Sequence, residues 1–187
     1  MQHLRPAALL AATMPNGRWQ VAAGALCTPL LGNSLTIAVR DCPQLVVTTR
    51  NQAAPLSPPH CFAYRIDRGE WHRFVAGTPQ PIPVPGGRGQ VTIITAGNCD
   101  LDPVWTGEGA FALTGIDLPT GATWQARSPR PVATVIGDSI TAGCWVAGKQ
   151  ASYDYRPEGN YLALASDQLG WPLARIAYSA AGFLRPG

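Results

Sequence analysis

The segment that most constrains the fold is VATVIGDSIT, residues 132–141. Its first half is a short, continuous apolar run, which is typical of a strand buried on both faces in a parallel sheet. The run ends at Gly137, where a residue without a side chain lets the backbone turn sharply. A strand that ends in Gly-Asp-Ser places Ser139 at the carboxyl edge of the sheet, where open α/β sheets hold their active sites.

Two later segments complete a βαβ unit with this strand. Residues 160–169, NYLALASDQL, fit a helix that is closed by Gly170, and residues 173–177 form a second strand-like apolar run. Strand, loop, helix and strand in this order predict an α/β region with a parallel sheet over residues 132–187.

Residues 1–125 have a different texture, with short apolar segments separated by turn residues. The predicted strands span residues 34–39, 44–49, 61–66, 90–95 and 110–118. Short strands at this spacing predict an all-β sandwich or jelly roll. Residues 64–71 indicate a hairpin with Asp67, Arg68 and Gly69 at its tip. The polar residues 126–131, which include two prolines, indicate a linker between the two domains.

Charge and hydropathy exclude several classes of protein. The net charge of +3 comes from scattered arginines without a basic run, so nothing supports nucleic-acid binding. No apolar run approaches the roughly 18 residues that a membrane span needs. Residues 1–17 make a poor signal peptide, because their Ala/Leu core is short and its flanks are weak. The location stays open, with a secreted or periplasmic protein favoured.

The five cysteines form no Cys-x-x-Cys pair, which argues against a zinc site. Cys27, Cys42, Cys61 and Cys99 could form two disulfides in an exported protein and leave Cys144 free. They fit equally well as small buried apolar residues. No metal ion or organic cofactor is expected.

Ser139 is the candidate nucleophile. A serine hydroxyl needs a base within hydrogen-bond reach. The backbone N–H of Ser139, near the start of the next helix or turn, can face a developing oxyanion. Asp138 is too close along the chain to be assumed to be the base, and we interpret it as an acceptor that fixes the turn. A bare Gly-Asp-Ser triplet also fits a helix N-cap, but Gly-Asp-Ser-Ile-Thr directly after a Val/Ile strand favours the nucleophile.

This five-residue string resembles the first conserved block of the SGNH (GDSL-type) hydrolases, which implies a three-layer, flavodoxin-like α/β domain and serine esterase chemistry. Residues 176–182, IAYSAAG, resemble the second block, which implies that the N–H of Gly182 is a second oxyanion donor. A sandwich before the nucleophile and the hairpin over residues 64–71 are similar to carbohydrate esterase family 2, whose members deacetylate plant polysaccharides such as xylan.

Two later SGNH blocks are absent from the chain. They are Gly-x-Asn-Asp, which supplies a third oxyanion contact, and Asp-x-x-His, which supplies the base and its orienting carboxylate. The histidines present, His3, His60 and His72, all lie in the predicted sandwich, where surface or packing roles are the plainer interpretation. We therefore expect a truncated or incomplete chain whose catalytic base lies outside this sequence.

The expected function is removal of O-acyl groups, acetyl above all, from a carbohydrate or another small ester. Trp145, Tyr153 and Tyr155 follow the nucleophile in a loop, where they could stack on sugars or pack beneath the loop. The alternative is a non-catalytic carbohydrate-binding module with a vestigial hydrolase segment. A third possibility is a second chain that supplies Asp-x-x-His, which a strict 19.8 kDa monomer would exclude.

Overall fold

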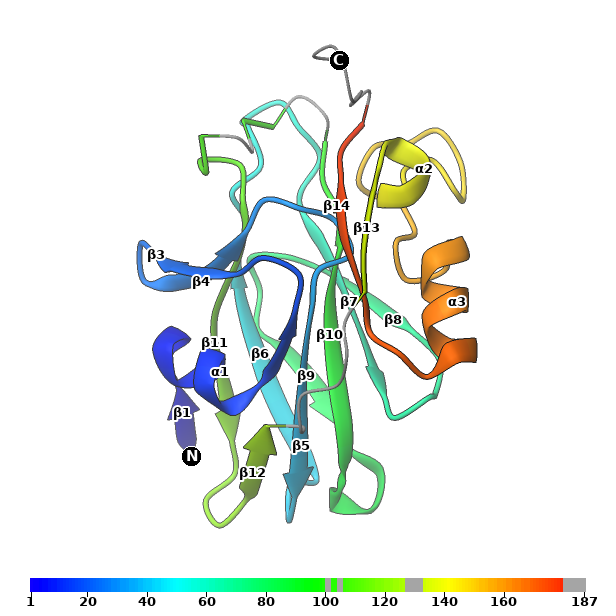
Figure 1. Ribbon diagram of the computed structural model, residues 1–187. Coiled ribbons are helices and arrows are strands. Elements are labelled where there is room, and N and C mark those ends of the chain that lie inside the picture. The colour runs from blue at the N-terminus through cyan, green and yellow to red at the C-terminus, as the bar shows by residue number, and fades with distance from the viewer. Residues whose placement is uncertain (100–101, 104–105, 127–132, 180–187) are drawn as a thin grey trace.

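A computed structural model describes residues 1–99, 102–103, 106–126 and 133–179 (Figure 1). The strands are β1 (Gln2–Leu4), β2 (Met14–Asn16), β3 (Gln20–Ala22), β4 (Ala25–Thr28), β5 (Ser34–Arg40), β6 (Gln44–Arg50), β7 (Cys61–Ile66), β8 (His72–Val75), β9 (Gln80–Pro83), β10 (Gly89–Gly97), β11 (Phe111–Leu118), β12 (Thr123–Ala126), β13 (Ala133–Gly137) and β14 (Leu173–Ala177). The helices are α1 (Pro6–Ala12), α2 (Ser139–Ala142) and α3 (Tyr161–Leu169), with a 3₁₀ turn at Pro85–Gly87.

Two antiparallel sheets form the predicted sandwich. One has the strand order β3-β4-β11-β6-β9, with β1 also paired to β11. The other has the order β12-β5-β10-β7-β8, with β2 also paired to β5. All five strands predicted for this region are present, and β7 and β8 form the predicted hairpin with Tyr64 opposite His72.

The sandwich core comes from the inward faces of both sheets. On β6 the residues alternate, so that Leu45 and Val47 are fully buried while the strand ends are exposed. Phe62 of one sheet meets Phe111 of the other edge to face, with ring centroids 5.6 Å apart. Burial of each such side chain contributes about 1.5–3 kcal/mol to the stability of the fold. Because Phe62 and Phe111 lie far apart in the sequence, contacts of this kind hold distant parts of the chain together.

The α/β region has the predicted βαβ order. β13 and β14 pair in parallel, with Ile136 opposite Ile176. The Asn160 side chain caps α3 by accepting the N–H of Ala163 at 3.2 Å, and Gly170 ends the helix in the left-handed conformation that glycine adopts without strain. The parallel pairing and the helix therefore follow the sequence pattern.

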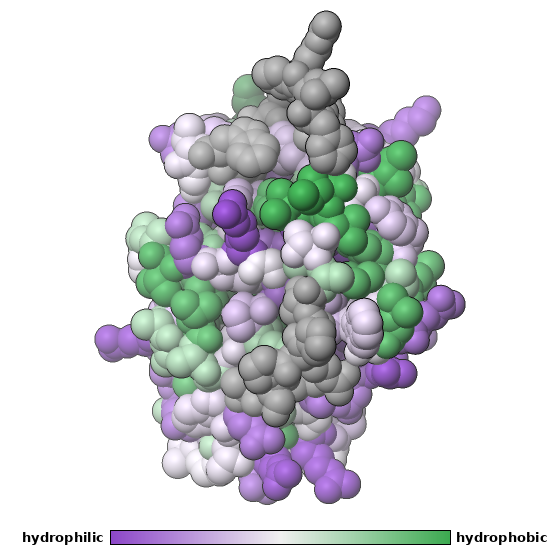
Figure 2. Space-filling model, in the orientation of Figure 1, coloured by the Kyte–Doolittle hydropathy of each residue, from purple (hydrophilic) through white to green (hydrophobic). Residues whose placement is uncertain are grey.

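The expectation that the first strand of this unit is buried on both faces is wrong. Ile136 is 59% exposed and Ile176 is 38% exposed. The two-stranded sheet places both on one face, and no described segment covers that face. Figure 2 shows the resulting apolar patch in green over the region of β13, β14 and α2.

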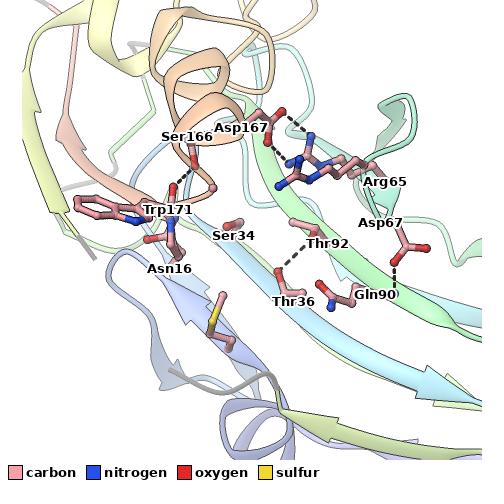
Figure 3. Close-up of a pocket in the computed structure, with 14 residues that line it drawn as sticks. Asn16, Ser34, Thr36, Arg65, Asp67, Gln90, Thr92, Ser166, Asp167 and Trp171 are labelled. Atoms are coloured by element: carbon pink, nitrogen blue, oxygen red, sulfur yellow. Dashed lines mark hydrogen bonds and ion pairs between the residues drawn. The ribbon is translucent and has the colours of Figure 1, made fainter. Parts of the chain in front are cut away.

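Several contacts join the α/β region to the sandwich. The guanidinium of Arg65 on β7 donates two hydrogen bonds to the Asp167 carboxylate on α3, at 2.7 and 2.6 Å. Arg73 on β8 donates to Glu158 at 2.5 Å. Figure 3 shows Arg65 and Asp167 at the side of a cleft of about 310 Å³ between β5, β10 and the end of α3. The two regions thus pack as one body.

The N-terminal Ala/Leu patch, considered above as a leader, forms α1 and packs against β4 and β11. Ala126 was predicted as the first linker residue. It is instead the last residue of β12 and pairs with Ile37. The other predicted linker residues, 127–131, lie outside the described residues. All five cysteines are buried, and Cys27, Cys42, Cys61 and Cys99 form no disulfides in the described structure, so they pack as small buried residues and the disulfide interpretation is wrong. No described helix is long and apolar enough to cross a membrane.

Candidate active site

Ser139 lies at the carboxyl end of β13, as the first residue of α2. The Asp138 side chain caps this one-turn helix by accepting the N–H of Ile140 at 3.0 Å. The Ser139 side chain is half-buried. A short polar cap followed by a single helical turn therefore places Ser139 at the carboxyl edge of the parallel sheet, the edge at which open α/β sheets hold their active sites.

Gly137 is needed for close packing. Its φ is not in the left-handed region, but a Cβ at this position would lie 2.1 Å from Oγ1 of Thr141. The Thr141 hydroxyl is itself held by the hydroxyl of Tyr161 at 2.9 Å, so it cannot simply rotate away. A side chain at position 137 would push α2 away from the strand.

We therefore expect Gly137→Ala to lower the free energy of unfolding by about 1–3 kcal/mol through overpacking. Urea denaturation measures this. Gly159→Ala is the matched control, because its Cβ would meet only Arg156, at 3.9 Å, and its φ is not positive. The packing account is wrong if the two variants unfold at the same urea concentration.

The turn is held from beneath by two buried residues. Asn160 donates from Nδ2 to the carbonyl oxygens of Ile140 and Thr141, at 3.2 and 3.0 Å. Arg175 donates from one guanidinium nitrogen to the carbonyl oxygens of Thr141 and Ala142, at 3.2 and 3.3 Å. The carbonyl groups at the end of a helix have no hydrogen-bond donor within the helix. The side chains of Asn160 and Arg175 supply the donors that these carbonyl groups of α2 lack.

The loop between α2 and α3 carries the three aromatic residues singled out from the sequence. Trp145 is 44% exposed and Tyr153 is 42% exposed, so both can meet a ligand. Tyr155 is fully buried and packs edge to face against Trp145 with ring centroids 4.8 Å apart. Of the two roles considered for Tyr155, the structure favours packing beneath the loop, because its ring belongs to the core.

Each of the three histidines has its partner within the sandwich. His3 lies 2.6 Å from Asp117, and His72 stacks on Tyr64. His60 is fully buried, with Nε2 3.2 Å from Oδ2 of Asp102. Their interpretation as surface or packing residues is confirmed, and none of them contacts Ser139.

Gly182, the second oxyanion donor implied by the resemblance, lies outside the described residues. Asn160 was predicted as part of a helix but not as a support for the turn that carries Ser139, and Arg175 was not singled out at all. The only signal in the sequence was an arginine at the centre of the apolar run 173–177, which is unusual for a buried strand. Groups of His, Cys, Asp and Glu able to hold a metal ion do not occur among the described residues.

A β-sandwich followed by a parallel βαβ unit with Gly-Asp-Ser at the end of its first strand defines the class of this structure. It matches, over nearly the whole chain, the N-terminal half of carbohydrate esterases of family 2, which belong to the SGNH hydrolases. No protein-family model matches the sequence, and no curated protein sequence matches it.

Three solved structures illustrate the match. A family two carbohydrate esterase from Cellvibrio japonicus has a TM-score of 0.75 at 17% identity, covering 99% of this chain and 54% of that one. An acetyl xylan esterase from Butyrivibrio proteoclasticus has a TM-score of 0.75 at 14% identity, covering 100% and 51%. A family two carbohydrate esterase from Clostridium thermocellum, in complex with cellohexaose, has a TM-score of 0.70 at 16% identity, covering 93% and 53%.

These TM-scores show a shared fold. The chain spans about half the length of the structures that it matches.

Proposed function

We propose that this chain forms the sandwich and the nucleophile-bearing part of an SGNH-type serine esterase that removes O-acyl groups, acetyl above all, from a carbohydrate. The observation that carries the proposal is the turn from β13 into α2, which puts Ser139 at the sheet edge behind an Asp138 cap. In this proposal residues 1–125 are one domain and residues 132–187 begin the catalytic domain.

In the proposed reaction the Ser139 hydroxyl oxygen attacks the carbonyl carbon of the ester. A histidine takes the serine proton and passes it to the oxygen of the leaving sugar alcohol, which leaves an acyl-serine. Water then attacks the acyl-serine and releases the carboxylic acid and free Ser139. The N–H groups of Ser139 and Gly182 would bind the oxyanion that forms at each attack.

The base in this proposal lies outside these 187 residues, because the three histidines of the chain are engaged in the sandwich. The exposed apolar face supports this part of the proposal. In the described structure Ile136 is 59% exposed, Ile140 is 69% exposed and Ile176 is 38% exposed. An apolar face of this kind marks a surface that another segment or chain covers.

A carbohydrate substrate is supported by the matched structures, which are carbohydrate esterases, and by the exposed Trp145 and Tyr153 in the loop after Ser139. Flat, exposed aromatic rings suit a pyranose ring, whose C–H groups pack on an aromatic face. An acetyl group is supported by the matched structure of an acetyl xylan esterase.

The test is acetate release from acetylated xylo-oligosaccharides. The full-length protein that contains these residues is expected to release acetate, whereas the 187-residue chain alone is expected to release none above the uncatalysed rate. Release by the 187-residue chain at the full-length rate would contradict the placement of the base outside it. No release by the full-length protein at any pH would contradict the esterase proposal.

A second candidate function is non-catalytic binding of a polysaccharide, favoured by the same exposed Trp145 and Tyr153. In that case the protein would bind cello- or xylo-oligosaccharides, Trp145→Ala would abolish binding, and no ester would be cleaved. The acetate assay and a binding titration on the same sample distinguish the two candidates.

A further inference from the structure

Arg175 is a buried cation beneath the nucleophile turn. It lies at the centre of β14 and is 3% exposed. Its guanidinium donates four hydrogen bonds, to the carbonyl oxygens of Thr141, Ala142 and Pro157 and to Oδ1 of Asn160, at 3.2, 3.3, 3.1 and 3.4 Å. Three of the four acceptors are therefore backbone carbonyls of α2 and of the loop that follows it.

No carboxylate among the described residues forms an ion pair with Arg175. Burial lowers the pKa of Arg175 to about 10, against the influence of Tyr161 and Glu158, so the side chain stays protonated at neutral pH. Its Nε is buried and has no partner in the described part of the chain. Burying a cation in such a place costs free energy of folding. A protein with an apolar residue of similar size in its place is often equally stable or more stable.

The sandwich makes room for this side chain. Gly32 approaches Arg175 so closely that a Cβ there would lie 2.3 Å from Nε of the arginine. The Arg175 side chain is therefore confined between a sandwich loop and the end of α2. This confinement fixes the direction in which its hydrogen bonds point.

Asn160 completes the support. It accepts a hydrogen bond from Arg175 and donates to the carbonyl oxygens of Ile140 and Thr141. Together the two side chains bind the carbonyl groups of three successive residues of α2, from Ile140 to Ala142. A helix of one turn is not stable alone, and a cation at its C-terminal end is favourable.

We propose that Arg175 is the positioning residue of the nucleophile: it holds the C-terminal carbonyls of α2 and thereby fixes where Ser139 at the other end of the turn points. The expected effect on catalysis rests on the proposed function. The expected effect on the stability of the α2 turn rests only on the hydrogen bonds described above.

The first test needs no activity and uses the 187-residue chain. The amides of Ala142, Gly143 and Cys144 donate to the carbonyl oxygens of Asp138 and Ser139 and so report on the α2 turn. Arg175→Met is expected to speed hydrogen exchange of these amides at least about tenfold, with the amides of β7 and β10 unchanged.

Arg65→Met is the matched control, because it breaks the ion pair to Asp167 at the same domain boundary without touching α2. It should leave exchange at the three α2 amides within about twofold of wild type. Unchanged exchange at these amides in Arg175→Met, or equal acceleration throughout the sandwich, would overturn the positioning role.

The second test uses the full-length protein. Since a displacement of about 1 Å can cost about a hundredfold in rate, Arg175→Met is expected to lower kcat about 10- to 100-fold with KM within about twofold, and Arg175→Lys to recover part of kcat. If Ser139→Ala abolishes activity but Arg175→Met keeps wild-type kcat, the positioning proposal alone fails. If Ser139→Ala keeps activity, the proposed function fails, and the exchange result still decides the structural part.

Discussion

Ser139→Ala is expected to lower the rate of acetate release by the full-length protein at least about a thousandfold, because a nucleophile and its base act as a unit. The change removes only the hydroxyl oxygen from a half-buried residue at the start of α2. The fold should therefore be unaffected. Acetate release and the circular dichroism spectrum, measured on one preparation, check both parts of the expectation.

Ser166→Ala is the matched control. Ser166 lies on α3, and its hydroxyl donates to the carbonyl oxygen of Trp171, away from the turn that carries Ser139. This variant should keep acetate release within about twofold of wild type. A Ser139→Ala protein that also stays within twofold would show that another residue is the nucleophile.

The second large effect concerns the stability of the sandwich. The Asp102 carboxylate is fully buried and accepts hydrogen bonds from the N–H groups of Ala54 and Cys99, both at 2.9 Å, beside His60. Asp102→Asn replaces one acceptor oxygen with a donor and leaves a buried N–H unsatisfied. We expect the free energy of unfolding to fall by about 3 kcal/mol, measured by urea denaturation at neutral pH.

The same carboxylate predicts a dependence on pH. Burial alone raises the pKa of Asp102, but the hydrogen bonds from His60, Ala54 and Cys99 outweigh it and hold the pKa below the usual value. A carboxyl with a lowered pKa in the folded state stabilises the protein above the ordinary pKa and loses that contribution as the pH falls through the folded value. Unfolding free energy should therefore decrease below about pH 4.

Asp167→Asn is the control for both measurements. Its carboxylate pairs with Arg65 and also has a lowered pKa, but it is 40% exposed. Solvent screening limits such a pair to about 1 kcal/mol or less. Equal losses of stability in the two variants would contradict the account of Asp102, whereas a steeper acid dependence in wild type than in Asp102→Asn would support it.

The sandwich was predictable because its strands repeat a simple pattern. The alternation in β6 and the apolar runs of β5 and β10 mark buried faces whatever the rest of the chain does. Short strands such as β2, β3 and β9 were missed, since a strand of three or four residues carries little periodicity and is defined by the strand with which it pairs. The exposure of β13 could not be foreseen from its own sequence. Whether a strand is buried depends on which other segments of the chain pack on its two faces.

The candidate site shows the same division. The turn at Asp138 and Ser139 follows from a local string, as does the helix over residues 160–169 with its end at Gly170. Arg175 lies 36 residues after Ser139 in the sequence and reaches α2 only through the parallel pairing of β13 and β14. The sequence left two roles open for Tyr155, because spacing places an aromatic residue in a loop without telling whether its side chain points outward or into the core.

The most direct test of the central claim is covalent capture of the nucleophile. The full-length protein is treated with a fluorophosphonate, which reacts with the activated serine of serine esterases, and the labelled peptide is identified by mass spectrometry. The account predicts one stoichiometric label at Ser139 and loss of acetate release in proportion to labelling. A protein that loses its esterase activity while the label lies on another residue would contradict it.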